Sequence, residues 1–265
     1  MNKTILFVGL VLISTLSVGQ SKQAGMPDEV SPDATATCQS TFTSGSVSTL
    51  LKFCVTANGN ITQLESPQNI EFISHGGFAE GYGVCDSTAG KAYFDYATND
   101  SGNWNAPVRT QPGGANTFPL KIVRTTADGI WTLTQNFSRN PGERYAKITM
   151  TLKNNTAISR TASLVRYADV DAPFGATEFT NTFDFTFSAG LGFVRGNFGL
   201  AIQNGTPPAA HTAFVQNVSF GPDPCNPFAN VPAATFTGDG SVGIVFPFTI
   251  PKTSAKTVAV IYRPF

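Results

Sequence analysis

The chain has 265 residues, a net charge of zero and a charged fraction of only 13%, about half the usual fraction near 25%. It shows no basic stripe of the kind that binds nucleic acid, which argues against nucleic acid as a partner. Phe, Thr, Val, Gly and Asn are common and strong helix formers are scarce, so the composition favours strands and turns.

Residues 1–20 are predicted to be a secretory signal peptide. A basic start at Lys3 precedes an uncharged apolar run, residues 5–18, which is the pattern of an export signal. The run is shorter than the roughly 20 residues of a spanning helix. We therefore expect an exported protein, secreted or periplasmic, with no transmembrane segment after the signal. Residues 21–37 are expected to be a disordered tail and residues 38–265 a single β-sandwich domain.

The four cysteines are Cys38, Cys54, Cys85 and Cys225. An even number in an exported chain predicts two disulfides. Of the three possible pairings we favour Cys38 with Cys54, which closes a short loop, and Cys85 with Cys225, which ties an early loop to a late one. The spacing does not fit a zinc site, because no two cysteines form a close pair and both histidines lie far from any cysteine in the sequence.

A hairpin is predicted first, from residues 50–56 and 61–64 around Asn58-Gly59, the strongest short hairpin pattern. A glycine-rich segment follows at residues 75–86 and carries His75 and Glu80. Glycines permit close approach of a ligand to the backbone, so both side chains are candidate ligand-binding residues. A bulged strand with a turn is the alternative interpretation of this segment.

A long loop is predicted over residues 98–115, after a short aromatic strand at residues 91–97. It places Trp104 between Asn103 and Asn105. An exposed indole ring can cover the apolar face of a sugar while amides bind its hydroxyl groups. These three residues are therefore candidate sugar ligands. The alternative is that Trp104 anchors the loop to the core.

Residues 118–171 are predicted to form four consecutive antiparallel strands joined by three tight turns. The clearest strand, residues 146–152, alternates apolar and polar side chains, so one face is apolar. The preceding strand repeats the pattern except at Gln135, which lies at a sheet rim or forms a hydrogen bond inside. Gly, Asp and Asn mark the turns, which we place at Ala127-Asp128-Gly129, Asn140-Pro141-Gly142 and residues 153–156.

The fourth strand, residues 158–170, is apolar on both faces, which predicts a central strand covered on both sides. It ends in the polar residues Arg166, Tyr167, Asp169 and Asp171. Asp169 and Asp171 are two residues apart in an extended strand, so they point the same way. Ca²⁺ takes 6–8 oxygen ligands, often from carboxylates. We therefore expect Asp169 and Asp171 as ligands of a calcium ion, with a solvated strand end as the alternative, and no other cofactor.

Paired carboxylates could also serve as acid and base in glycoside chemistry. The candidates for that role are Glu80, Asp86, Asp169, Asp171 and Glu178. A Ser-His-Asp triad is poorly supported, because the only histidines are His75 and His211 and no G-x-S-x-G sequence occurs. The chain is predicted to end in a hairpin of residues 242–250 and 256–262, introduced by Asp239-Gly240.

The runs FCVTANGNITQLESP, EGYGVCD, RTTADGIWTLTQ, LKNNTAISRTASLVRYADVD and GPDPCNPF resemble those of a family of exported all-β bacterial proteins. That resemblance implies secretion and an all-β fold. More distantly, the order of elements is similar to the galactose-mutarotase-like super-sandwich. In that fold a long strand after an N-x-T turn ends at the sugar site. The mutarotase histidine is replaced here by Arg166, Asp169 and Asp171, so mutarotase activity is not implied.

These observations predict a large antiparallel sandwich of two sheets with little or no helix. The first functional hypothesis is a non-catalytic binding or surface-interaction module for carbohydrate, whose partner is an extracellular glycan or a cell-surface component. The second is a carbohydrate-active enzyme of super-sandwich type, mutarotase-, lyase- or hydrolase-like. The third is a structural envelope protein without a small ligand.

Overall fold

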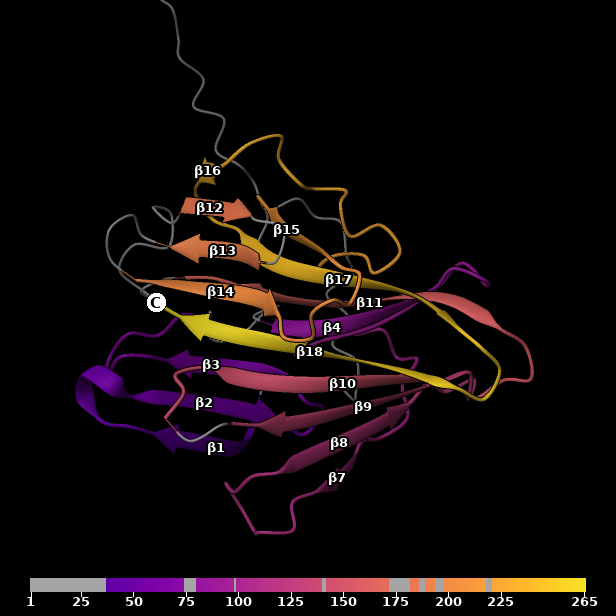
Figure 1. The fold of residues 1–265 in the computed structure, drawn as a ribbon, viewed down its shortest axis with the longest axis horizontal. Helices are drawn as coiled ribbons and strands as arrows, with labels where there is room; N and C mark the ends of the chain where they lie inside the picture. Colours follow the sequence, from indigo (N-terminus) through magenta and orange to yellow (C-terminus); the bar gives the residue numbers. More distant parts are fainter. Residues whose placement is uncertain are drawn as a thin grey trace, which may run out of the picture.

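The computed structural model describes residues 37–73, 80–97, 99–139, 142–171, 182–185, 189–193, 198–217 and 221–265. Antiparallel strands form a nine-stranded, a six-stranded and a three-stranded sheet (Figure 1). Among the described residues the only helical element is one 3-10 turn, η1 (Val47–Thr49). The predicted all-β antiparallel sandwich is confirmed, and the three-stranded sheet is an addition to the two large sheets.

The nine-stranded sheet has the order β16-β12-β13-β14-β18-β10-β9-β8-β7. Its strands, in chain order, are β7 (Val108–Thr110), β8 (Leu120–Thr125), β9 (Trp131–Ser138), β10 (Ala146–Asn154), β12 (Thr182–Phe185), β13 (Ala189–Phe193), β14 (Gly199–Asn204), β16 (Phe236–Thr237) and β18 (Ala255–Pro264). The strands β8, β9 and β10 pair with one another in this order, which confirms the first three strands of the predicted meander.

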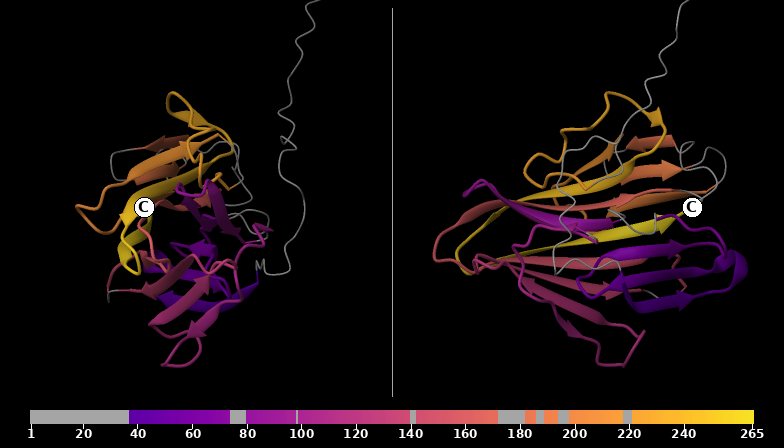
Figure 2. Two further views of the ribbon diagram at one scale, coloured as in Figure 1. Left: turned by 90° about the vertical axis from the view of Figure 1, so that its right-hand side faces the viewer. Right: turned by 180° about the vertical axis from the view of Figure 1, so that it is seen from behind.

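The six-stranded sheet has the order β15-β17-β11-β4-β5-β6. Its strands are β4 (Glu80–Asp86), β5 (Lys91–Tyr96), β6 (Asn99–Asp100), β11 (Arg160–Asp169), β15 (Thr212–Gln216) and β17 (Ser241–Ile250). The three-stranded sheet contains β1 (Cys38–Ser44), β2 (Leu51–Thr56) and β3 (Ile61–Glu65). Figure 2 shows the same sheets from the side and from behind.

All three sheets share one apolar core. Alternate residues of β10, such as Ile148 and Met150, are buried against residues of the six-stranded sheet such as Leu164 and of the three-stranded sheet such as Phe53. The intervening β10 side chains are partly or fully exposed. The alternation in the sequence therefore identified the buried face of this strand correctly, because a strand has a side-chain period of two.

The fourth strand of the predicted meander does not join the first three. β10 belongs to the nine-stranded sheet, whereas β11 lies between β17 and β4 in the six-stranded sheet. The prediction of four consecutive paired strands is therefore wrong at its last step. The prediction that β11 is central and covered on both faces is confirmed, because its last six residues are all buried.

The predicted C-terminal hairpin is wrong for the same reason: β17 and β18 also lie in different sheets. One side chain stabilises both places where the chain passes from one large sheet to the other, between β10 and β11 and between β17 and β18. Asn154 Nδ2 donates to the carbonyl oxygens of Ile158 at 2.7 Å and of Ile250 at 3.1 Å. An extended chain that leaves a sheet has unpaired carbonyl groups, and the buried amide of Asn154 supplies a donor for them.

Both favoured disulfides are confirmed, Cys38–Cys54 and Cys85–Cys225. The predicted hairpin around Asn58-Gly59 is confirmed as β2 and β3, with Gly59 at a φ of 96°. Gln135 is buried and hydrogen-bonded inside, as one of the two interpretations required. The predicted signal peptide lies outside the described residues. No helix in the described ranges is long and apolar enough to cross a membrane.

Candidate functional site

The end of β11 presents different chemistry on its two faces. Arg166 and Val170 face the shared core, whereas Tyr167, Asp169 and Asp171 face the outer side of the six-stranded sheet. This division follows from the two-residue side-chain period of a strand. The two acidic side chains predicted as cation ligands therefore do share one face.

A third carboxylate, that of Asp239, joins them from the segment immediately before β17. Asp169 pairs with Ser241, and the Val170 amide donates to the Gly240 carbonyl at 3.3 Å. Continuing this antiparallel register by two residues brings Asp171 opposite Asp239. Residues directly opposite in an antiparallel pair have Cβ atoms roughly 4.5–5.5 Å apart. The pairing of two strand ends thus brings together acids that are distant in the sequence.

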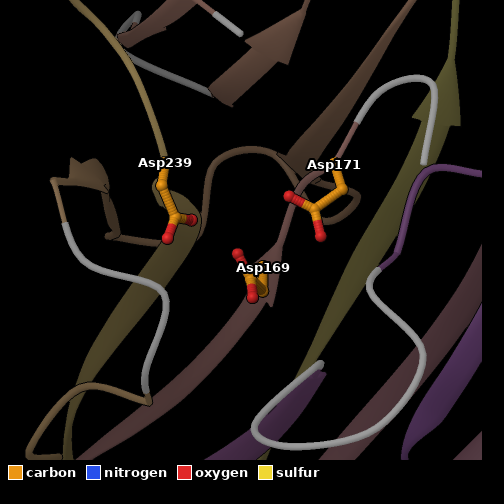
Figure 3. Close-up of side chains that lie close together, drawn as sticks. All are labelled: Asp169, Asp171 and Asp239. Atoms are coloured by element: carbon orange, nitrogen blue, oxygen red, sulfur yellow. The ribbon is translucent and has the colours of Figure 1, made fainter. Parts of the chain in front are cut away.

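Figure 3 shows the carboxylates of Asp169, Asp171 and Asp239 turned toward one another. One oxygen from each lies within 4.8 Å of the others. Asp169 is 6% exposed and Asp171 4% exposed, whereas Asp239 is half-buried. Three acids placed so closely repel one another unless a positive charge or protons compensate them. We call these three residues the acidic cluster.

Neutral polar side chains on the neighbouring strands lie beside the acidic cluster. Ser241 lies between Asp169 on β11 and Gln216 on β15. The Ser241 hydroxyl donates to Gln216 Oε1 at 3.3 Å, and Gln216 Nε2 donates to the Pro227 carbonyl at 3.1 Å. Pro227 belongs to the loop that carries Cys225. The disulfide-bonded loop is thereby connected to the row of side chains that contains Asp169.

The acidic cluster suits a hard cation. Ca²⁺ and Mg²⁺ prefer oxygen ligands, and a carboxylate can bind Ca²⁺ through one or both oxygens. Asp169, Asp171 and Asp239 can supply three to six such oxygens from two strand ends. The structure places a third carboxylate, Asp239, beside the two predicted ligands, and Asp239 is the residue that sequence reasoning missed. Its only signal in the sequence is the Asp-Gly pair immediately before a predicted strand.

Arg166 and Glu80, both predicted as ligand-binding residues, lie deep between the sheets. Both side chains are fully buried and form an ion pair, with Arg166 Nε 2.5 Å from Glu80 Oε1. Arg166 also donates to the Tyr262 hydroxyl at 2.8 Å, to Gln135 Oε1 at 2.5 Å and to the Gly59 carbonyl at 2.9 Å. A ligand in solution cannot reach these groups, so the predicted role of both residues is wrong.

The Arg166 guanidinium joins all three sheets. Its acceptors come from β4, β9, β18 and the β2–β3 turn. Burial raises the pKa of Glu80, while Arg166 and the hydroxyl of Tyr262 oppose that rise. Glu80 also faces the core side of the six-stranded sheet, whereas Asp169 faces outward, so these two carboxylates cannot act on one substrate as acid and base.

Trp104 is only 2% exposed, so the predicted sugar-stacking role is wrong and the alternative, anchorage of the loop, is confirmed. Its ring lies edge-on to Tyr82 and Tyr93. The Arg124 guanidinium lies 5.5 Å from the indole centroid. A buried ring has no free face for a sugar. Apolar and cationic partners explain its position.

The remaining predicted residues do not gather at one site. Asn103 is half-buried and donates to the Ala92 carbonyl at 3.5 Å, whereas Asn105 is exposed. Tyr167 is buried edge-on against Tyr96. Asp86 lies opposite Ala162, seven residues and so roughly 23 Å from Asp169, too far to pair with it. His75 and Glu178 lie outside the described residues.

A second buried charge network surrounds Arg124. Its Nη1 atom lies 2.5 Å from Asp95 Oδ2 and 2.8 Å from Asp100 Oδ2. Burial raises the pKa of Asp95 to about 7; Arg124 opposes this rise and Asp100 adds to it. Two carboxylates share one guanidinium here, so the buried group carries an excess negative charge, which a proton on Asp95 relieves.

This network predicts a pH dependence of stability. The folded protein keeps a proton on Asp95 up to about pH 7, whereas the unfolded chain releases it near pH 4. The free energy of unfolding should therefore fall as the pH rises from about 4 to about 7. In Asp95→Asn that fall should shrink by a few kcal/mol, as measured by urea unfolding at several pH values. The exposed Asp223→Asn is the control, and an unchanged slope in Asp95→Asn would contradict the prediction.

Comparison with known proteins gives a result at the level of fold only. No protein-family model and no curated protein sequence matches the chain. A bacterial glucoamylase solved with acarbose is similar over 92% of this chain, with 13% identity and a TM-score of 0.59. A polysaccharide lyase is similar over 83% of the chain, with 10% identity and a TM-score of 0.50. An inferred aldose 1-epimerase from Escherichia coli K12 is similar over 85%, with 10% identity and a TM-score of 0.47.

The chain spans about a third of the glucoamylase (34%) and of the lyase (33%). At these identities the likeness concerns the arrangement of strands and transfers no residue. The glucoamylase and the lyase therefore show that this chain shares the arrangement of strands of those two proteins, and the galactose-mutarotase-like resemblance stays a prediction.

Proposed function

We propose that this protein is an exported, non-catalytic carbohydrate-binding module whose glycan site borders the end of β11. In this proposal Asp169, Asp171 and Asp239 hold a calcium ion that contacts the sugar. The convergence of three carboxylates within 4.8 Å carries the proposal, because it joins two separate strand ends at one point.

The chemistry of the acidic cluster supports a glycan ligand. Three carboxylates fill only part of the 6–8 oxygen positions around Ca²⁺. Sugar hydroxyl groups are oxygen ligands for the remaining positions, and each can also donate a hydrogen bond to a carboxylate. The fold likeness to carbohydrate-active proteins supports the same ligand class. The two disulfides support export, since disulfides persist in oxidising compartments.

Calcium should stabilise the wild-type protein. A ligand at 100 times its dissociation constant adds about 2.7 kcal/mol, which raises the Tm of a domain of this size by roughly 5–10 °C. Asp239→Asn should lose most of this shift, because one of three charged ligands becomes a neutral amide. The measurement is thermal unfolding with excess EDTA and with Ca²⁺.

Asp223→Asn is the matched control, because it removes one exposed carboxylate from the Cys225 loop, outside the acidic cluster. It should retain the full calcium shift. A wild-type protein that melts at the same temperature with Ca²⁺ and with EDTA would refute the calcium site. An equal loss in both variants would show that the effect is general surface charge.

A glycan array with Ca²⁺ and with EDTA tests the ligand class. We expect binding that requires Ca²⁺ and is weaker in Asp239→Asn. Release of reducing ends or unsaturated products from a bound glycan would instead support the enzymatic alternative. Such release would require Asp169 and Asp171 to act on the sugar directly, and EDTA would not be expected to abolish it.

A further inference from the structure

The nine-stranded sheet has an outward face that carries only positive charge over five adjacent strands. These strands are β14, β18, β10, β9 and β8, which run side by side in Figure 1. The alternate residues that do not enter the core are half-buried or exposed on β8, β9 and β10, and on β18 apart from the buried Ala259. We call the outward-facing residues of the five strands the basic face.

Four cations lie on the basic face: Lys121, Lys147, Lys153 and Arg263. No outward-facing residue of these five strands, all of which lie in the described part of the chain, is Asp or Glu. Along the strand order of the sheet, the next strand residue that is acidic is Asp184 on β12, two strands beyond β14. The chain has no net charge, so the fold has segregated cations onto this face.

The register spreads the cations over an area rather than gathering them at a point. Lys147 and Lys153 are six residues apart on β10, a separation of roughly 20 Å. Lys121 lies two strands away, opposite Asn136, which in turn lies opposite Thr149. Two strand spacings correspond to roughly 10 Å. This arrangement suits an extended polyanion with several separate charges better than one small anion.

Aromatic rings border the same face at its β13–β14–β18 end. Phe265 is 53% exposed, and its ring centroid lies 6.2 Å from that of half-buried Phe193. Gly199 lies against both residues, and a side chain there would collide with the Phe193 Cβ and with the Phe265 ring. Arg263 lies over the Tyr145 ring at 4.8 Å and donates to Gln203 Oε1 at 3.0 Å. Exposed rings beside a guanidinium provide stacking and anion binding together.

The area between the cations is lined by groups that bind hydroxyls. Thr134, Asn136, Thr149 and Thr151 face outward from β9 and β10. Each offers a donor and an acceptor for hydrogen bonds. A membrane surface or a nucleic-acid backbone has charge but few hydroxyl groups to match this lining. An acidic sugar chain has both.

We propose that the basic face binds an anionic polysaccharide, with the lysines and Arg263 pairing with its carboxylate or sulfate groups and with Phe193 and Phe265 packing on sugar rings. The surface is separate from the acidic cluster, which lies on the other large sheet. The binding is therefore expected to persist in EDTA. A protein that does not bind calcium would contradict the proposed function but not this inference. A protein that does not bind anionic polysaccharides would contradict this inference but not the proposed function.

The test uses the full mature protein with heparin, polygalacturonate and uncharged dextran, in EDTA and at several salt concentrations. We expect binding to at least one of the two polyanions, none to dextran, and weaker binding at high salt. Lys121→Ser/Lys147→Ser should bind roughly tenfold more weakly, if each exposed pair contributes about 0.7 kcal/mol. Phe265→Ala should also weaken binding, which a purely electrostatic surface would not show.

Lys52→Ser/Lys252→Ser is the matched control, since it removes the same charge from one half-buried and one exposed lysine outside the basic face, as the double variant does on it. It should bind like the wild type. Equal weakening in both double variants would overturn the proposal, as would failure to bind either polysaccharide. Tighter binding to phosphatidylglycerol vesicles or to duplex DNA than to both polysaccharides would also overturn it and would identify a different class of partner.

Discussion

Replacement of Arg166 by methionine is expected to lower the free energy of unfolding by about 3–5 kcal/mol, as for other buried ion pairs that lose one partner. Arg166 is fully buried, and its donors reach Glu80, Tyr262, Gln135 and Gly59. Removal of the guanidinium leaves a carboxylate and three other oxygen acceptors without that donor. Each buried acceptor left unsatisfied costs about 1–3 kcal/mol.

The loss should depend on pH. Without Arg166, the Glu80 carboxyl in the core takes a proton in order to stay buried, because a lone buried charge is far more costly. The unfolded chain ionises the same group above about pH 4. The folded variant therefore holds one more proton than the unfolded variant, and its stability relative to the wild type should fall as the pH rises from 5 to 8.

A double variant separates charge from packing. In Arg166→Met/Glu80→Gln the remaining amide can still accept the Ile61 amide hydrogen, which Glu80 Oε2 accepts at 2.6 Å in the wild type. We expect it to be more stable than Arg166→Met alone at pH 8, and to lose the extra pH dependence. Guanidinium unfolding at pH 5 and pH 8 measures both effects. A loss below about 1 kcal/mol in the single variant would contradict the bridging role of Arg166.

The strands could be predicted where the local pattern decides the outcome. In β10 the alternation of apolar and polar side chains identifies the buried face. In the β8–β9 turn Gly129 adopts a φ of 74°, a conformation that favours glycine. Both depend only on neighbouring residues. The pattern of β11 likewise predicts burial on both faces, which the structure confirms.

The partner of each strand could not be predicted in the same way. The turn after β10 has the composition of a hairpin, yet Asn154 uses its side chain to satisfy carbonyls of two segments while the chain passes to the other sheet. A turn that stays within a sheet and one that leaves it use the same residue types. The choice depends on packing between sheets, which no local pattern records.

The candidate site shows the same limit. Asp169 and Asp171 are neighbours in the sequence, so their common face could be predicted. Asp239 joins them only through the register of β11 with β17. Trp104 was misjudged because its Asn-rich surroundings in the sequence are not its surroundings in space, where Tyr82, Tyr93 and Arg124 enclose the ring.

Loss of the Cys85–Cys225 disulfide is the second large effect that we predict. In the chain-entropy description, a cross-link stabilises the folded state by restricting the unfolded chain, and the effect grows with the length of the closed loop. The sequence separations are 140 residues for Cys85–Cys225 and 16 for Cys38–Cys54. Removal should cost roughly 5 kcal/mol for the first and roughly 3 kcal/mol for the second.

The two stability losses thus differ by about 2 kcal/mol. The loop that Cys225 anchors should increase this difference. This loop covers the outer face of the six-stranded sheet, where Phe228 packs edge-on against Phe214 and the Gln216 amide donates to Pro227. If the loop loosens without its disulfide, apolar residues such as Val165 become exposed, at a further cost of about 25 cal/mol per Å².

The two paired variants, Cys85→Ala/Cys225→Ala and Cys38→Ala/Cys54→Ala, serve as controls for each other because each removes one disulfide and two sulfur atoms. Urea unfolding of both should rank the first as the less stable. Under the proposed function, the first should also bind calcium more weakly, because Gln216 connects the loop through Ser241 to the row of side chains that contains Asp169. Equal stability, or the reverse order, would mean that restriction of the unfolded chain is not what these disulfides contribute, and that local packing around Cys38–Cys54 stabilises the fold more than loop closure does.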